Sequence, residues 1–206
     1  MVRPMAGRTL DFIFDFGSPN AYLAYRALPP ILARTSARLR LLPCLLGGIF
    51  KATGNQSPFA AFGHVKGKLA YEELETRRFI ARHALTRFRM NPHFPVNTLQ
   101  LMRGLVAAQK AGAGERYVEA GLAGMWEEGR KMDDPAVLGE VLSAAGLDAG
   151  ALLAATGDPA IKAELAANTE AAVARGVFGI PTFFVDAEMW FGKDRLHEVE
   201  AALGPA

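Results

Sequence analysis

Residues 10–22 read LDFIFDFGSPNAY, and this stretch combines a strand pattern with the start of a helix. Leu10 to Phe16 alternates apolar and acidic residues and then stops at Gly17, as a strand with a period of two does. Ser18 is a residue type that caps helix N-termini. Pro19 suits the first helical position, because its missing N–H would have no partner there anyway. The stretch therefore predicts a strand that passes directly into a helix, with a serine hydroxyl at the junction.

A second strand is predicted from Arg38 to Leu42. Two strands joined by a helix form a βαβ unit, in which the strands are parallel and the crossover is right-handed. The segment LLGGIFKATGN, residues 45–55, follows this unit and is expected to be a glycine-containing loop.

The middle of the chain differs from both ends. From about Val65 to Arg175 nearly every segment has helical spacing, and Asp134-Pro135 and Asp158-Pro159 each place a capping acid before a proline, which marks a helix start. Strand character returns only near the C-terminus. The elements expected there are strands at Pro181 to Val185 and Met189 to Phe191, and a helix from Lys193 to Leu203.

Strands therefore lie at both ends of the chain, and the fold class is α/β. The order βαβ then ββα, with VFGIPT at residues 177–182 before the third strand, matches the thioredoxin fold. Neither half could bury a sheet alone, so the ends must meet. We predict a discontinuous thioredoxin-like domain of residues 1–58 and 176–206, interrupted by an all-helical insertion domain of residues 59–175.

In the thioredoxin fold, the first helix begins with a reactive dithiol that faces a cis-proline loop. Here Gly17-Ser18-Pro19-Asn20 replaces the dithiol, and Ile180-Pro181 is predicted to be the cis bond. A cis bond there would expose the N–H and C=O of Ile180, which can pair with an extended peptide in the way an added strand does. A disulfide oxidoreductase is excluded, because this turn has no thiol to exchange.

The composition excludes several other classes. The chain has 206 residues, of which 50% are hydrophobic, and its formal charge is only +2, so it predicts a globular fold without a nucleic-acid partner. No membrane span or targeting segment is expected, because the longest uncharged apolar stretch, Leu41 to Phe50, is about half a span. Cys44 is the single cysteine and the four histidines lack metal-ligand spacing, so we expect no disulfide, no metal and a cytoplasmic location.

Six segments together resemble a known family, the 2-hydroxychromene-2-carboxylate isomerases, which are relatives of the kappa-class glutathione transferases. Each motif alone is modest, but their order and spacing along most of the chain make a specific signal. They are DFIFDFGSPNAYLA (11–24), LLGGIFKATGN (45–55), KLAY (68–71), NPHFPVNT (91–98), GVFGIPTFFVD (176–186) and WFGKDRL (190–196).

The resemblance implies glutathione as cofactor, a small aromatic carboxylate as substrate and a homodimer. It also implies an activity, the reversible isomerisation of 2-hydroxychromene-2-carboxylate to trans-o-hydroxybenzylidenepyruvate in naphthalene-type aromatic catabolism. The thiolate would add to the conjugated system, the ring would open, a C–C bond would rotate, and the thiolate would leave.

This setting explains a serine without a histidine to activate it. A thiol of pKa about 8.5 is only a few per cent ionised at pH 7. A hydroxyl that donates a hydrogen bond to the sulfur, beside a helix N-terminus, favours the thiolate. Ser18 would donate a proton to a hydrogen bond without losing it, so it needs no base.

The resemblance assigns other residues too. Asn55 would lie near the cofactor, Lys68 would contact a carboxylate of glutathione or substrate, and Asp194 would bind the γ-glutamyl ammonium while the α-carboxylate rests on N–H groups at the helix start. Arg195 would bind glutathione or instead brace Asp194. The expected glutathione-binding residues are Ser18, Asn55, Lys68, Ile180, Pro181, Asp194 and Arg195, and the expected substrate-binding residues are Phe50, Tyr71, Asn97 and Trp190. Core positions remain the alternative for Phe50, Tyr71 and Trp190.

Two other functions stay open. One is a kappa-class-like glutathione transferase or peroxidase that uses the same thiolate on another electrophile. The other is a non-catalytic thioredoxin-like binding protein that has lost its dithiol. Retention of Ser18, Asn55 and Asp194 together with the Ile-Pro segment argues against the second, because a scaffold would need none of these polar residues.

Overall fold

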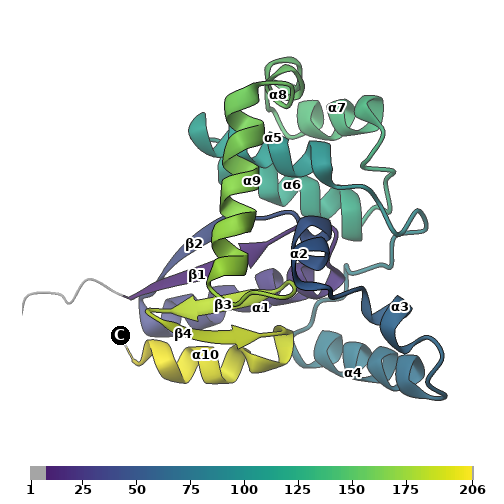
Figure 1. Cartoon of the computed structure of the whole chain (residues 1–206), viewed down its shortest axis with the longest axis vertical. Helices are drawn as coiled ribbons and strands as arrows, with labels where there is room; N and C mark the ends of the chain where they lie inside the picture. The colour runs from purple at the N-terminus through teal and green to yellow at the C-terminus, as the bar shows by residue number, and fades with distance from the viewer. Residues whose placement is uncertain (1–7, 206) are drawn as a thin grey trace, which may run out of the picture.

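The computed structural model describes residues 8–205, and four strands form a single mixed sheet in the order β2-β1-β3-β4 (Figure 1). These are β1 (Thr9–Phe14), β2 (Arg38–Pro43), β3 (Thr182–Val185) and β4 (Glu188–Phe191). β1 and β2 are parallel, while β3 is antiparallel to both β1 and β4. The α/β class, the parallel first pair and the meeting of the two chain ends are confirmed.

Helix α1 (Pro19–Thr35) makes the crossover between the parallel strands, and Ser18 caps its start as predicted. Helix α10 (Leu196–Leu203) packs against α1 and β3, whereas α5 (Leu99–Lys110) and α9 (Pro159–Ala174) contact β2 from the other side (Figure 1). The remaining helices are α2 (Leu46–Thr53), α3 (Pro58–Phe62), α4 (Lys68–Arg82), α6 (Gly114–Trp126), α7 (Pro135–Ala144), α8 (Ala149–Ala155) and the 3-10 helix η1 (Lys193–Arg195). The two Asp-Pro pairs do start helices, since Asp134 caps α7 and Asp158 caps α9.

The expected loop at residues 45–55 is wrong, because most of this segment is helix α2. Two distant side chains hold its start: the Leu45 N–H donates to Thr169 Oγ1 at 3.0 Å and the Leu46 N–H to Asp15 Oδ2 at 2.7 Å. These bonds satisfy donors that a helix start leaves unpaired, and so offset the low helix propensity of glycine. A Cβ at Gly48 would lie 3.2 Å from Thr169 Cγ2, so the glycine permits α2 to approach α9 closely.

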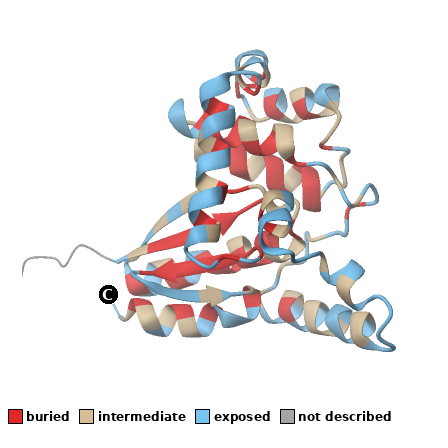
Figure 2. Ribbon diagram, viewed as in Figure 1, coloured by how far each residue is buried: buried red, intermediate tan, exposed pale blue. Residues whose placement is uncertain are grey.

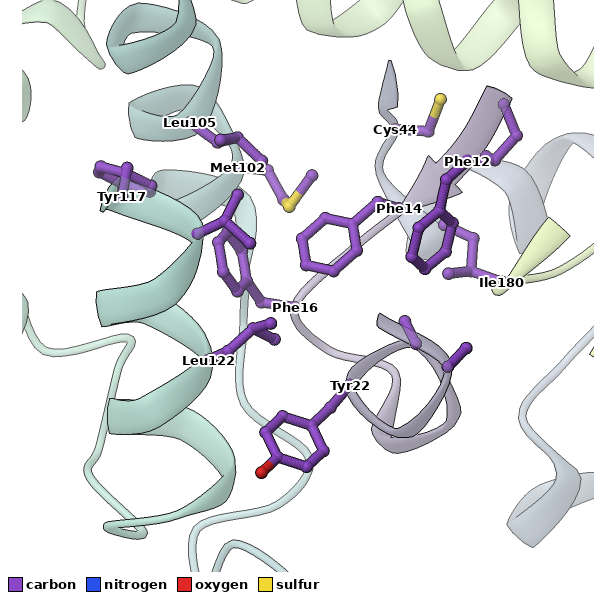
Figure 3. Close-up of a cluster of buried hydrophobic side chains, with 14 of the residues drawn as sticks. Phe12, Phe14, Phe16, Tyr22, Cys44, Met102, Leu105, Tyr117, Leu122 and Ile180 are labelled. Atoms are coloured by element: carbon purple, nitrogen blue, oxygen red, sulfur yellow. The ribbon is translucent and has the colours of Figure 1, made fainter. Parts of the chain in front are cut away.

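The core extends from the sheet into the helices α5 and α6, as the buried residues in Figure 2 show. The aromatic rings of β1 continue into it beyond the strand, where Phe14 and Phe16 meet edge to face at 4.9 Å (Figure 3). The Trp126 indole N–H donates to the Phe16 carbonyl at 2.8 Å, and a Cβ at Gly121 would lie only 2.5 Å from the Phe16 ring. The end of β1 is therefore packed inside the helical part of the protein.

The surface helices differ from this core. In α4 only Phe79 is buried, and Phe59, Phe62 and Tyr71 of α3 and α4 are exposed. Among residues 8–205, no helix combines the length and the apolar character needed to cross a membrane.

A buried carboxylate ties β1 to its neighbours. Asp11 is 5% exposed and opposes Arg40 of β2, whose guanidinium donates to both of its oxygens at 2.6 Å. Arg175, just after α9, donates to Asp11 Oδ2 at 3.2 Å. Burial acts to raise the pKa of Asp11, but the hydrogen bonds and charges of the two arginines outweigh it and lower the pKa below its ordinary value.

We predict that Asp11→Asn lowers the free energy of unfolding at pH 7 by about 1–2 kcal/mol, a modest amount because both arginines stay partly solvated. Since the folded-state pKa is depressed, this stability is present above the unfolded pKa of about 3.9 and is lost as the pH falls through the folded value. Urea unfolding of both proteins as a function of pH measures the difference. Glu73→Gln, which breaks an exposed ion pair with Arg77, is the control and should change stability by less than about 0.5 kcal/mol. A gap between Asp11→Asn and wild type that persists unchanged at pH 2 would contradict the assignment.

Candidate functional site

The Ser18 hydroxyl lies at the junction of β1 and α1 and is 4% exposed. It accepts a hydrogen bond from the Ala21 N–H at 3.2 Å, which caps α1, and donates one to the Ile180 carbonyl at 2.9 Å. The structure thus places Ser18 against the loop before β3, across 162 positions of sequence. A hydroxyl has a single proton to donate, so Ser18 can donate to a ligand only by turning that proton away from Ile180.

Asp15 holds the turn that carries Ser18. It is 0% exposed, and it accepts hydrogen bonds from the Gly17 N–H at 2.8 Å and from the Leu46 N–H at 2.7 Å. Burial raises the pKa of Asp15 above its ordinary value, although hydrogen bonds from Gly17, Leu46 and Thr98 act in the opposite direction. One carboxyl group therefore fixes both the turn before α1 and the start of α2.

The Ile180–Pro181 bond is cis, as predicted, and so is Phe94–Pro95. The expectation that Ile180 exposes both of its backbone groups is only partly met, because its carbonyl accepts the Ser18 hydroxyl. Its N–H donates to nothing within residues 8–205. Asn55, which follows the C-terminus of α2, holds the same loop, since its Nδ2 donates to the Phe178 carbonyl at 2.7 Å. Ser18, Asn55, Ile180 and Pro181 are therefore brought together around one loop.

Asp194 lies in η1 with its carboxylate 64% exposed. Its partner is Lys193, whose Nζ is 3.0 and 3.1 Å from the two carboxylate oxygens, and the idea that Arg195 braces Asp194 is wrong. Arg195 points to Glu198 instead, at 3.1 Å. Lys193 is itself 4% exposed, with its ammonium group 5.3 Å from the centre of the Phe79 ring. Sequence reasoning missed Lys193 because a lysine is usually exposed, and only the assembled fold shows its burial.

The residues predicted on α4 lie apart from this group. Lys68 pairs with Glu72 at 2.6 Å and its Nζ lies 5.4 Å from the Phe62 ring centre. Tyr71 is 54% exposed, so the core alternative for it is wrong. Within the described part of the chain, no hydrogen bond or ion pair joins either residue to Ser18 or Asp194.

The predicted substrate residues lie on different elements. Phe50 on α2 and Trp190 on β4 are half-buried. Asn97 is exposed before α5, and its Oδ1 accepts the Leu99 N–H at 3.0 Å. Phe191 on β4 forms an aromatic pair with Phe178 of the loop before β3, with ring centres 4.6 Å apart.

The one thiol of the chain is not available in place of a dithiol. Cys44 is buried and donates to the Asn168 carbonyl at 3.4 Å. Burial, with the charge of Asp15 in second place, raises the pKa of the Cys44 thiol to about 12. A reactive sulfur at Ser18 would therefore have to come from a ligand.

Comparison with known proteins gives a consistent picture. The family model described as the DSBA-like thioredoxin domain matches residues 9–204. The 2-hydroxychromene-2-carboxylate isomerase of Sphingobium xenophagum is 31% identical over 198 residues, 95% of this chain and 98% of that protein. The glutathione S-transferase kappa 1 of Homo sapiens is 27% identical over 215 residues, 96% of this chain and 91% of that protein.

Solved structures agree with these relatives. A structure of 2-hydroxychromene-2-carboxylate isomerase superposes with a TM-score of 0.80 at 29% identity, and the match covers 95% of this chain and 94% of that one. A probable DsbA oxidoreductase from Streptomyces coelicolor, at 23% identity and a TM-score of 0.72 over 95% and 88% of the two chains, shares the fold.

Proposed function

The chain belongs to the DSBA-like thioredoxin domain family, and from this and its similarity to 2-hydroxychromene-2-carboxylate isomerases we propose that it is a glutathione-dependent isomerase of that kind. It would interconvert 2-hydroxychromene-2-carboxylate and trans-o-hydroxybenzylidenepyruvate. The observation that carries the proposal is the Ser18 hydroxyl at the start of α1, where the fold otherwise holds a thiol, beside a cis-proline loop.

The residues around this loop fit glutathione. The Ile180 N–H has no partner within residues 8–205 and suits a peptide carbonyl. Asp194 presents an exposed carboxylate, held from beneath by buried Lys193, and this carboxylate suits the ammonium of a γ-glutamyl end. When bound, glutathione supplies the thiolate nucleophile of the reaction.

The residues of the chain would bind glutathione, orient it and polarise its thiol. Ser18 would turn its hydroxyl proton from the Ile180 carbonyl toward the ligand sulfur, and the N-terminus of α1 would add a favourable field. Asn55 would keep the loop in place through Phe178. Lys68, Arg195, Phe50, Tyr71, Asn97 and Trp190 remain the proposed outer contacts of cofactor and substrate.

A homodimer is part of this proposal. The exposed apolar side chains of α3 and α4, among them Phe59, Phe62 and Tyr71, support it, because contiguous exposed apolar surface is typical of protein interfaces. Light scattering of the purified protein measures its mass. A monomer at all concentrations would contradict the proposed homodimer.

The deciding experiment for the function is an assay with the chromene carboxylate, with and without glutathione. We expect interconversion followed by ultraviolet absorbance only when glutathione is present. If neither condition shows turnover, an aryl halide assay tests the alternative, a kappa-like transferase acting on another electrophile. If neither activity is observed, the remaining alternative is a non-catalytic thioredoxin-like binding protein.

Ser18→Ala should retain glutathione binding but lose most of the bound thiolate, with a fall in turnover of about 100-fold, the size of effect seen when one preorganised donor is removed. The ultraviolet absorbance of the bound thiolate near neutral pH is the measurement. The variant also loses a helix cap, worth about 1 kcal/mol. Asp148→Ala removes the comparable cap of α8 and serves as the control, with thiolate and turnover unaffected. An unchanged thiolate signal in Ser18→Ala would remove Ser18 from this role.

Asp194→Ala should weaken glutathione binding about tenfold or more, because one charge-assisted hydrogen bond to the ligand ammonium is lost, with little effect on thiol ionisation. Calorimetric titration gives the dissociation constant. Glu140→Ala, which removes a carboxylate from an exposed ion pair with Arg130 outside the proposed site, is the control and should bind normally. Equal dissociation constants for Asp194→Ala and wild type would contradict the assignment.

A further inference from the structure

A cavity of about 510 Å³ lies between α2, α5 and α9, a volume within the usual range of small-molecule sites. Figure 1 shows α2 beside the lower half of α9. Most of the cavity wall is apolar. The apolar side chains are Leu45, Ala52, Leu99, Leu165, Ala166 and Val173.

The charged residues of this cavity are unbalanced. Three cations, Lys51, Arg103 and Lys162, line it with a single acid, Glu170. Within residues 8–205, none of these three cations takes part in an ion pair. Three cations without an ion pair therefore gather around one largely apolar cavity, where their charge favours an anionic group.

Arg103 is the most distinctive of the three. Its Nε is buried and has no hydrogen-bond partner within the described residues. Thr169, the hydroxyl residue of the wall, is already occupied, since it accepts the Leu45 N–H and donates to the Leu165 carbonyl. A buried guanidinium N–H that lacks an acceptor is satisfied best by an anionic oxygen, and arginine binds a carboxylate through two parallel hydrogen bonds.

We propose that this cavity binds an amphipathic organic anion, with its ring or chain against the apolar wall and its carboxylate or sulfonate on Arg103. The binding site is additional to the one at Ser18. None of the residues that line the cavity belongs to the set proposed to hold glutathione, so the inference does not depend on the proposed function.

The cavity has a polar neighbour. A second cavity of about 310 Å³ shares Leu99 and Arg103 with it and is also lined by Asn97, Gln100, Asp133 and Thr156. Arg103 therefore lies between an apolar space and a polar one. This is the position that suits the charged end of a molecule whose other end is apolar.

Calorimetric titration of the full chain with 1-naphthoate and with uncharged 1-naphthylmethanol tests the proposal. We expect saturable binding of naphthoate and at least tenfold weaker binding of the alcohol. Arg103→Met should weaken naphthoate binding at least tenfold and leave the alcohol within about twofold, because the charge is lost while the apolar part of the side chain is largely kept. Arg38→Met, at an exposed residue of β2 away from the cavity, is the control and should bind like wild type.

A cavity-filling variant gives a second readout. Ala166→Phe, on an exposed position of α9, should weaken both ligands at least tenfold without affecting Arg103. Equal naphthoate affinity in wild type, Arg103→Met and Ala166→Phe, or no saturable naphthoate binding at all, would overturn the proposal. So would competitive displacement of naphthoate by glutathione, because it would make the two sites one. Glutathione binding is measured separately, from the thiolate absorbance. A wrong assignment of this cavity can therefore be told apart from a wrong proposed function.

Discussion

The hydrogen bonds that the Asp15 carboxyl accepts are the constraint on which the site depends. This group is completely buried, and burial of a carboxyl group is costly unless donors surround it. Its two oxygens accept the N–H groups of Gly17 and Leu46, which belong to the turn before α1 and to the first turn of α2. The direction of Ser18 and the course of α2 toward Asn55 therefore follow from one buried side chain.

The hydrogen bond from Ser18 to the Ile180 carbonyl is compatible with the role that we propose for the serine, which needs no base. In this state the hydroxyl caps α1 with its oxygen and joins the cis-proline loop with its proton. A hydrogen bond to a thiolate is stronger than one to a neutral carbonyl, because the acceptor carries a charge. Exchange of one acceptor for the other requires rotation of a hydroxyl group only. In the proposed reaction no proton has to leave the serine, so no histidine is needed to activate it.

The sequence predicted a helix or strand correctly where its local pattern agrees with the packing of the whole fold. The alternation of apolar and acidic residues predicted β1, and the two Asp-Pro pairs predicted the starts of α7 and α9. The sequence did not predict helix α2. The N–H groups of Leu45 and Leu46 at its start donate to Thr169 and Asp15, and no pattern near residue 45 indicates these distant partners. Of the two roles considered for Arg195, the contact with Asp194 is wrong for a related reason. Lys193 and Arg195 are equally near Asp194 in sequence, and the burial of Lys193 beside Phe79 of α4 arises only in the assembled fold.

The features that could bind ligands lie where the sheet and the helices meet, and the packing of β1 explains why. Phe16 inserts between Tyr117 and Gly121 of α6, and Trp126 donates to its carbonyl. The helices are thereby fixed directly against the turn that carries Ser18, so neither part can move without disturbing this turn. The cavity at Arg103 has the same origin, since α2 follows β2 while α5 and α9 come from the helical segment. Concave binding sites form preferentially at such boundaries between parts of a fold.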